Sequence, residues 1–355
     1  MCKVKVGLLP FYLKLYDDCC PKQRQQVEAF AEIIRAEYAK RKIEVVNAPV
    51  CCVKSEFADA VKRFESAGVE AIVTLHLAYS PSLESADVLA NTDLPIVILD
   101  TTPDFAFGFG QPAEAIMANH GIHGVQDMCN LLIRNGKNFM IEAGHWQESD
   151  VIDRTVSRLH ACKMFRTMRN SRVGIIGKPF DGMGDFAIDF AALKKTIGFD
   201  VISLDTEKFK CFLSGISETE IDSEIQNILT TFSSGEYSAK SMRDTVVACL
   251  AIRAWLQHEK LNAFSVNFLN VTKASGIPVV PFLEASKAMS RSIGYAGEGD
   301  VLTAALVGAL MTVFHETTFS EMFCPDWKGN RIFLSHMGEV NPEVCVGKAM
   351  LHEKL

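Results

Sequence analysis

The chain has 355 residues, of which 48% are hydrophobic and 22% charged, and its formal net charge is −7. This length predicts two or three domains, and the composition is that of an ordinary globular protein. The acidic balance, with no local run of Lys and Arg, argues against a nucleic-acid partner and favours a small ligand.

The N-terminal residues MCKVKVGLLPFYLKLYDD place charges inside what would have to be the apolar core of an export signal. No later apolar run reaches the length of a membrane span, so we expect a cytoplasmic protein with no membrane partner. The eleven cysteines form no C-x-x-C pair that would indicate zinc or redox chemistry. In a reducing compartment we expect most of them to be buried free thiols.

Short β-rich runs alternate with helical patterns in the first part of the chain. The predicted strands are KVKVGLLP, IEVV, EAIVTLHL and LPIVILD, with one helix over roughly 22–40 and further helices between the later strands. This alternation indicates βαβ units that build a parallel sheet. We therefore predict a doubly wound α/β domain over residues 1–168.

The same alternation restarts at SRVGIIGKPFDGMGDF, which predicts a strand, a glycine loop and a helix. Further strands are predicted at GFDVISLD, NAFSVNF and IPVVPFL, so a second doubly wound α/β domain is expected over 169–313. The glycines of the loop fit neither the dinucleotide fingerprint nor the P-loop signature, and nucleotide binding is not expected. They are Gly174, Gly177, Gly182 and Gly184.

The segment GYAGEGDVLTAA carries two acids, Glu298 and Asp300, among glycines just before an apolar run. One carboxylate suffices to cap the helix predicted over 301–314, so the second acid needs another reason. Beyond that helix, TTFSEMFCPDWKGNRIFLSHMGEV contains two β-like runs around a turn-rich loop, which is typical of a hairpin. We predict that this hairpin starts a β-rich C-terminal domain over 314–355.

The hairpin and the glycine segment together predict a cluster of three metal-ligating side chains. A turn centred between Lys328 and Gly329 places Glu321 directly opposite His336, with Cβ atoms about 5 Å apart. The helix carries the chain about 21 Å from Glu298, and the linker that follows spans about 23 Å when extended, so an antiparallel return is just long enough. Two carboxylates and an imidazole suit Mn²⁺ or a similar divalent ion, and the carboxylates could move a proton between neighbouring carbons.

The same three residues also have ordinary structural explanations. Glu298 could be a capping acid, Glu321 a surface strand residue, and His336 a histidine hydrogen-bonded in the core. Spacing alone leaves both explanations open.

Beyond spacing, three C-terminal motifs resemble a known family, the L-arabinose and L-fucose isomerases. GYAGEGDVLTAAL, TTFSEMF and KGNRIFLSHMGEV are similar, in the same order, to the metal-binding core of L-arabinose isomerase, and LHLAYSP, NHGIHGVQDM, AGHWQE and NAFSVNF are similar more weakly. The resemblance implies two α/β domains and a β-rich one. It also implies a Mn²⁺-dependent aldose–ketose isomerase, in which a proton moves between C1 and C2 of a small sugar through an enediolate. The implied assembly is a homo-oligomer, a trimer or hexamer, with sites at subunit interfaces.

The resemblance further implies roles for individual residues. Glu298, Glu321 and His336 match the metal ligands, and the two glutamates match the catalytic acid and base. His120 and His123 are equally well explained as an i, i+3 pair on a helix face, and His145 and Trp146 are expected to be structural. The remaining matches contact the sugar, within the pocket or from a neighbouring subunit: His120, His123, Phe268, Phe319, Met337 and Met183.

The chain departs from the family pattern in two places. GLLPFYLKLYDD does not match the substrate-contacting turn after the first strand, which leaves the identity of the sugar open. The family also continues beyond this sequence and supplies another metal histidine there, a position that His352 does not match. A truncated, inactive isomerase homologue is therefore one alternative. The other is a non-catalytic sugar-binding or sensing protein, which would bind sugar without metal and yield no product.

Overall fold

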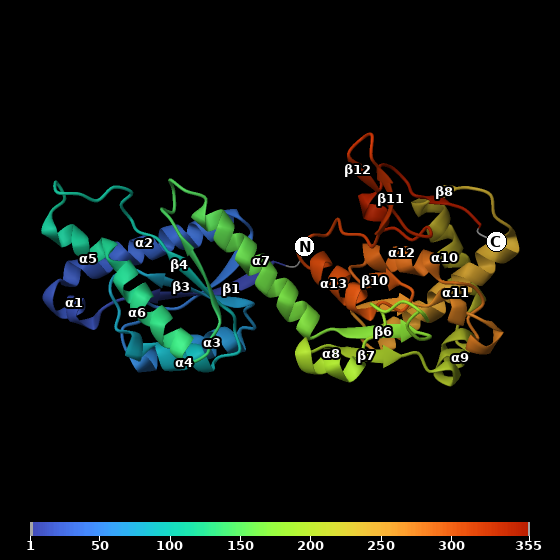
Figure 1. The fold of residues 1–355 in the computed structure, drawn as a ribbon, viewed down its shortest axis with the longest axis horizontal. Helices are drawn as coiled ribbons and strands as arrows, with labels where there is room; N and C mark the ends of the chain where they lie inside the picture. The colour runs from blue at the N-terminus through green and yellow to red at the C-terminus, as the bar shows by residue number, and fades with distance from the viewer. Residues whose placement is uncertain (1–2, 354–355) are drawn as a thin grey trace. The chain divides into compact units, whose positions relative to one another are not determined.

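The computed structural model describes residues 3–353, and the chain divides into two compact units, residues 2–163 and 164–355. The boundary between them falls within helix α7 (Val151–Arg169). Each unit is a parallel sheet flanked by helices (Figure 1), which confirms the predicted α/β class. The residues from 314 onward lie in the second unit, and their assignment to a separate β-rich domain stays a prediction.

The first unit contains a five-stranded parallel sheet with the strand order β2-β1-β3-β4-β5. β1, β3 and β4 are buried on nearly every residue, which explains their almost continuous apolar sequences. The four strands predicted for this region are confirmed, and the fifth is an addition. The strands are β1 (Val4–Phe11), β2 (Ile43–Asn47), β3 (Ala71–His76), β4 (Ile96–Asp100) and β5 (Phe139–Ala143).

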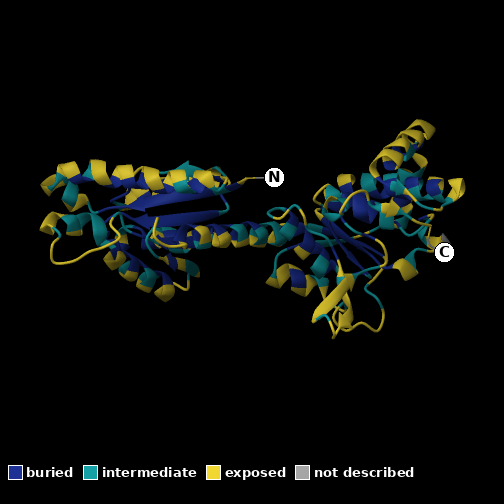
Figure 2. Ribbon diagram, turned by 90° about the horizontal axis from the view of Figure 1, so that it is seen from above, coloured by how far each residue is buried: buried dark blue, intermediate teal, exposed yellow. Residues whose placement is uncertain are grey.

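Helices cover both faces of this sheet, as burial along the ribbon in Figure 2 shows. α2 (Pro21–Lys40) and α7 pack into one core cluster, and α3 (Lys54–Ser66) and α6 (Gly121–Arg134) pack into the cluster on the other face. The chain runs from the interior strand β1 to the edge strand β2 and then returns past β1 toward the opposite edge, so the sheet is doubly wound. The shorter helices are α1 (Lys14–Cys19), α4 (Ala86–Asn91) and α5 (Ile116–Asn119).

The second unit contains a four-stranded parallel sheet with the order β10-β9-β6-β7. Three of its strands were predicted, but IPVVPFL is not a strand: no residue from 277 to 281 is in one, and α12 begins at Phe282. Pro278 and Pro281 lack the N–H groups that a strand ladder needs. The strands are β6 (Arg172–Ile176), β7 (Asp200–Ser203), β9 (Ala263–Val266) and β10 (Gly294–Gly297). The helices are α8 (Phe190–Thr196), α9 (Thr206–Ser214), α10 (Glu218–Thr231), α11 (Ala239–His258), α12 (Phe282–Ser290) and α13 (Val301–Met311).

The edge strand β10 was not predicted because its sequence, GYAG, lacks the branched residues typical of strands. Its glycines instead allow the backbone of α13 to approach the backbone of β10 closely. A Cβ on Gly294 would lie 2.3 Å from the carbonyl oxygen of Ala304 and 2.4 Å from the amide nitrogen of Gly308. α13 therefore packs directly against the backbone of β10, and it ends at Met311, three residues before the predicted end.

The predicted hairpin is confirmed as the antiparallel pair β11 (Glu321–Asp326) and β12 (Arg331–Ser335). Its large apolar side chains are exposed, for example Met322 at 78% and Phe333 at 61%. A two-stranded hairpin without cover on either face is only marginally stable by itself. A short parallel pair, β8 (Ser233–Ser234) and β13 (Met350–Leu351), lies elsewhere in this unit.

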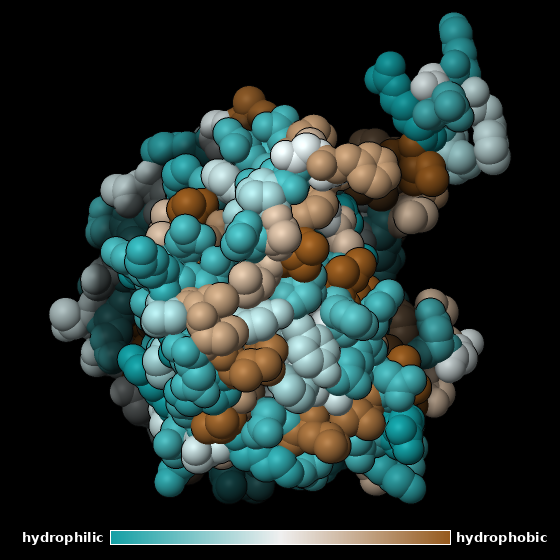
Figure 3. Space-filling view, turned by 90° about the vertical axis from the view of Figure 1, so that its left-hand side faces the viewer, coloured by the Kyte–Doolittle hydropathy of each residue, from teal (hydrophilic) through white to brown (hydrophobic). Residues whose placement is uncertain are grey.

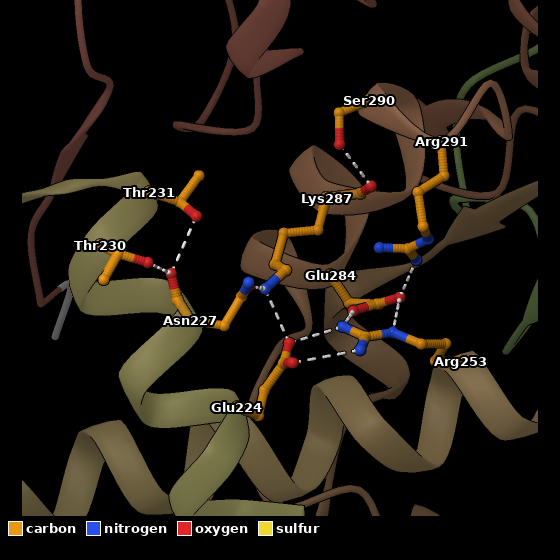
Figure 4. Close-up of polar contacts among 9 residues, drawn as sticks. All are labelled: Glu224, Asn227, Thr230, Thr231, Arg253, Glu284, Lys287, Ser290 and Arg291. Carbon is orange, nitrogen blue, oxygen red and sulfur yellow. Dashed lines mark hydrogen bonds and ion pairs between the residues drawn. The ribbon is translucent and has the colours of Figure 1, made fainter.

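An ion-pair network joins helices α10, α11 and α12 of the second unit (Figure 4). Arg253 lies 2.6 Å from a carboxylate oxygen of Glu224 and 2.8 Å from one of Glu284, whose side chain is fully buried. Lys287 lies 2.7 Å from Glu224, and Arg291 contacts Glu284. Because three cations surround two buried carboxylates, removal of the central arginine would leave uncompensated charge in the interior.

Every cysteine from Cys19 to Cys345 is a free thiol. The expectation that most are buried is wrong: Cys51, Cys52, Cys162 and Cys249 are buried, whereas the other six described cysteines are exposed or partly exposed. Among residues 3–353, no helix is both long enough and apolar enough to cross a membrane.

Candidate active site

The two acids at the start of α13 have different tasks. Asp300 is the N-cap residue, and its side chain accepts a hydrogen bond from the amide of Thr303 at 2.9 Å. Glu298 lies two residues earlier, outside the helix, with φ at +61°, in the left-handed region that non-glycine residues seldom occupy. The capping role therefore belongs to Asp300, and the side chain of Glu298 is available for another purpose.

Backbone hydrogen bonds hold Glu298 in this unfavourable conformation. Its amide donates to the carbonyl of Val266 at 2.8 Å, and its carbonyl accepts from the amide of Phe180 in the glycine loop at 3.0 Å. The hydroxyl of Ser265 donates to the carbonyl of Gly297 at 2.9 Å and accepts from the amide of Gly299 at 2.9 Å. Local backbone strain of this kind is found where surrounding structure determines a functional geometry.

His336 follows β12 and lies against the end of β10. Its side chain is only 4% exposed, and its ring packs edge-on against Phe319 with the centroids 4.9 Å apart. A Cβ on Gly297 would lie 2.8 Å from Cε1 of His336 and 3.0 Å from Nε2. Glycine is therefore required at position 297 for the imidazole to occupy this place.

Glu321, the first residue of β11, reaches the same imidazole. One of its carboxylate oxygens lies 3.8 Å from Nε2 of His336. The predicted register, however, is wrong by one residue: Glu321 pairs with Ser335 and not with His336. A bulge between Met322 and Cys324 inserts one extra residue into β11, which shifts the pairing beyond it.

The charges of these groups are coupled. Burial and the neighbouring charge of Glu321 raise the pKa of Glu298, and Glu339 and Asp185 add to the effect. Burial by itself lowers the pKa of His336, but the contacts with Glu339 and the charges of Glu321 and Glu298 outweigh it, so the net pKa is raised. The site therefore carries a surplus of negative charge around one imidazole, which favours a bound cation or proton.

The chemistry of this donor set fits a divalent ion, because carboxylate oxygens and an imidazole nitrogen are typical ligands of such ions. A buried carboxylate oxygen of Glu339 also lacks a hydrogen-bond partner among the described residues. As the side chains stand within residues 3–353, no three His, Cys, Asp or Glu residues are close enough together to form a ligand shell. The metal site predicted from Glu298, Glu321 and His336 thus stays a prediction, supported by donor type and charge.

Phe268, Phe319 and Met337 were predicted to line a sugar pocket beside these donors, and Met183 to reach the site from a neighbouring subunit. Phe319 is 6% exposed and touches His336, whereas Phe268 and Met337 are 36% and 43% exposed. The ring of Phe268 packs at a tilt against that of Phe180 in the glycine loop, with centroids 5.8 Å apart, and Met183 lies exposed in the same loop. The glycine loop, whose sequence suggested only an imperfect phosphate loop, is thus attached to Glu298 through Phe180.

His120 and His123 lie in the first unit, at the start of α6, and not in the unit that contains Glu298. Nε2 of His120 is 3.0 Å from the hydroxyl of Tyr16, and the ring of His123 is 5.6 Å from that of Tyr79. Their assignment to a neighbouring subunit's sugar site stays a prediction.

His145 and Trp146, expected to be structural, also lie in the first unit. Nε2 of His145 lies 3.2 Å from the carbonyl oxygen of Pro103, and Nδ1 accepts a hydrogen bond from the amide of Glu148 at 3.1 Å. Trp146 packs against the core with its ring centroid 6.4 Å from that of Phe30.

Two residues of the site, Glu339 and Tyr295, were not identified from the sequence. Glu339 follows His336 by three residues and contacts its Nδ1 nitrogen at 2.8 Å, and the hydroxyl of Tyr295 donates to the same carboxylate oxygen at 2.9 Å. The spacing of His336 and Glu339 within SHMGEV was a usable signal for the first. No local signal points to Tyr295, because it lies in a strand far away in the sequence.

Comparison with known proteins supports the resemblance. Residues 189–316 match the L-arabinose isomerase central domain. The L-arabinose isomerase of Herpetosiphon aurantiacus is 23% identical over 352 residues, covering 93% of this chain and 69% of that protein. Those of Shewanella baltica and Geobacillus kaustophilus are 24% and 26% identical over 64% of this chain, which aligns with only 47% of each. The expected relationship to the L-arabinose isomerases is thus confirmed at low identity.

Among solved structures, an ABC sugar transporter (periplasmic sugar binding protein) from Legionella pneumophila aligns with 88% of this chain and 96% of its own at 10% identity. The TM-score is 0.22, so this likeness supports no statement about the fold or the ligand.

Proposed function

We propose that this chain, a relative of the L-arabinose isomerases, is a Mn²⁺-dependent isomerase that interconverts an aldose and a ketose. One observation carries the proposal. The charges of Glu321 and His336, at the hairpin, influence the pKa of Glu298, which follows β10 in the same unit, and Glu321 lies 3.8 Å from His336. Isomerase chemistry is supported at the level of the relatives, whereas the metal and the mechanism are proposals.

The three side chains Glu298, Glu321 and His336 would hold the ion. When bound, a divalent ion supplies Lewis acidity that polarises a sugar carbonyl and lowers the energy of an enediolate. Glu298 is suited to carry a proton because burial and the charge of Glu321 raise its pKa toward neutral pH. One glutamate would take the proton from C2 of the aldose and return it to C1, while the other moves the hydroxyl proton from O2 to O1.

The substrate proposed is a pentose or a 6-deoxyhexose, and the assembly proposed is a homo-oligomer with sites at subunit interfaces. Exposed apolar residues of the first unit support association with another subunit (Figure 3). They include Leu15, Phe105, Phe107, Phe109, Ile116 and Ile122. A trimer or hexamer, and a cytoplasmic location, are parts of the same proposal.

The test is a ketose assay with Mn²⁺ and a panel of aldoses, run in deuterated water. Transfer through a carboxylate predicts that ketose formation is accompanied by partial incorporation of deuterium at C1, because the transferred proton exchanges with solvent. Glu298→Gln and Glu321→Gln should each reduce the rate at least about 100-fold. Glu316→Gln, at an exposed carboxylate, is the matched control. Activity that survives in either glutamate variant would refute the assigned roles.

An inactive homologue is the second candidate, because no three donors converge within residues 3–353. Metal analysis of the purified protein distinguishes the two candidates. A competent site should retain close to one ion per chain after dialysis against Mn²⁺, whereas an incomplete shell should lose it.

A further inference from the structure

A polar cavity lies between helices α10 and α12 of the second unit, beside the ion-pair network of Figure 4. Its volume is about 410 Å³, which is in the range of cavities that hold small molecules. None of its lining residues was assigned to the candidate active site. The lining residues that carry most of the argument are Ser223, Glu224, Asn227, Lys287, Arg291 and Glu343.

Both helices turn one face toward this cavity. Glu224, Asn227 and Thr231 follow one another at three and four positions along α10, so their side chains lie on one side of it. Lys287 and Arg291, four positions apart at the end of α12, share one side of that helix in the same way. Two rows of polar side chains therefore bound the cavity.

The charges of the network do not cancel. Burial by itself raises the pKa of Glu224, but hydrogen bonds from Arg253 and Lys287 outweigh it and lower the pKa to about 2, so Glu224 is ionised at neutral pH. The second carboxylate is the fully buried Glu284, whose partners are Arg253 and Arg291. Three cations therefore face two buried carboxylates, and one positive charge is left over.

Donor groups in the lining remain without partners. The ammonium of Lys287 has three N–H groups, and two of them reach Glu224 at 2.7 Å and Oδ1 of Asn227 at 2.8 Å. The third has no partner within residues 3–353, although the side chain is only 10% exposed. In the same part of the chain the guanidinium of Arg291 makes a polar contact only with Glu284, and the amide N–H groups of Asn227 make none. The cavity therefore offers N–H donors on three side chains to a ligand.

Two features oppose an anion in this cavity, and both are offset. α10 and α12 end beside it, and a helix C-terminus disfavours negative charge. Carbonyl oxygens near these ends already accept hydrogen bonds, however, since Thr231 donates to Asn227 and Ser290 donates to Lys287, each at 2.8 Å. Glu343 also lines the cavity, but it is exposed, so water and salt screen its charge.

The free donors select a ligand by shape as well as by charge. A carboxylate has its two oxygens in one plane, which the fork of a single arginine can satisfy. A phosphate group has three strong acceptor oxygens that point in different directions, and it makes better use of a guanidinium, an ammonium and an amide on two helices. We propose that this cavity binds the phosphate group of a small phosphate monoester, with Arg291, Lys287 and Asn227 as donors. The remaining volume accommodates the rest of that molecule beside the hydroxyls of Ser223 and Thr231.

Isothermal titration calorimetry of the metal-free chain tests the proposal, with inorganic phosphate, glycerol phosphate and acetate as probes. We expect about one phosphate per chain with a Kd below about 1 mM, tighter binding of glycerol phosphate, and binding of acetate that is weaker by about 10-fold or more. Arg291→Gln should weaken phosphate binding about 10-fold or more, because a charge-assisted hydrogen bond is lost. Arg243→Gln, at a surface ion pair with Glu218, is the matched control and should bind phosphate as the wild type does.

A second pair of variants leaves every ion pair intact. Ser223→Trp fills the cavity from α10 and should abolish phosphate binding, whereas Gln226→Trp, exposed on α10 outside the lining, should not. Thermal unfolding without ligand shows which variants are folded, and Ser223→Trp decides the question if Arg291→Gln is not.

Three results would overturn the inference. They are a wild type without saturable phosphate binding, acetate that binds as tightly as phosphate, and phosphate binding that is unchanged in folded Arg291→Gln or Ser223→Trp. Because no metal enters the titration, each result is independent of the proposed isomerase function.

Discussion

His76, at the end of β3, should make the first unit sensitive to mild acid. Its side chain is buried against Phe11, with ring centroids 4.2 Å apart, and neither ring nitrogen has a hydrogen-bond partner among the described residues. Burial lowers its pKa from 6.5 to about 3. Because the folded state excludes a proton that the unfolded chain binds, stability is lost as the pH falls from 6.5 toward 3.

The magnitude follows from this pKa difference. A pKa difference of one corresponds to about 1.4 kcal/mol, so moving from about pH 7.5 to about pH 5 should lower the free energy of unfolding by roughly 2 kcal/mol through His76. His76→Leu removes the titrating group at similar volume. Its absolute stability changes too, but its loss of stability between the two pH values should be roughly 2 kcal/mol smaller than that of the wild type.

Urea unfolding of the first unit, followed by the fluorescence of Trp146, measures this difference. Trp255→Phe and Trp327→Phe in the background leave Trp146 as the sole reporter of the three tryptophans. His258→Gln is the matched control, because that side chain is 61% exposed. An equal loss of stability in wild type and His76→Leu between the two pH values would refute the assignment.

Three further changes test the second unit. Gly297→Ala puts a Cβ 2.8 Å from Cε1 of His336, so the imidazole must move. The Mn²⁺ affinity measured by calorimetry should then fall about 10-fold or more, and the free energy of unfolding should drop by about 1–3 kcal/mol. An unchanged Mn²⁺ affinity would contradict the role of His336 as a ligand. Arg253→Met leaves the buried charge of Glu284 without its main partner, so the free energy of unfolding measured in urea should fall by about 3–5 kcal/mol. The surface variant Arg243→Met should lower it by less than about 1 kcal/mol. Mn²⁺ affinity should rise with pH, because His336 has a raised pKa and must lose its proton to bind; a pH-independent affinity would exclude His336 as a ligand.

Much of the fold follows from short-range patterns in the sequence. The predicted strands of the first sheet, the capping role of Asp300 and the hairpin around Lys328 and Gly329 all depend on residues close together in the chain. Strand β10 could not be predicted in this way, because its glycines are explained only by the helix α13 that packs against it. The strand predicted at IPVVPFL was wrong for the opposite reason. Its branched residues favour a strand, but its prolines and the start of α12 prevent one.

The candidate site shows the same limit. Glu298, Glu321 and His336 were identified from spacing and resemblance; Glu321 lies 3.8 Å from His336, and the charges of both influence the pKa of Glu298. The precise partner of Glu321 was mistaken, because a one-residue bulge leaves no clear mark in the sequence. Tyr295 was missed because its partner, Glu339, lies 44 positions away, and such a contact exists only once the chain has folded.

That bulge gives β11 one position at which a change of length leaves the pairing intact. Loss of Phe323 would remove the extra residue and leave Glu321 opposite Ser335 and Met322 opposite Leu334. Loss of one residue from β12 would instead slip the register by one position and exchange the faces on which its later side chains project. Natural variants shortened in β11 at the bulge are thus expected to keep the acid beside the imidazole, whereas variants shortened in β12 are expected to lose that contact.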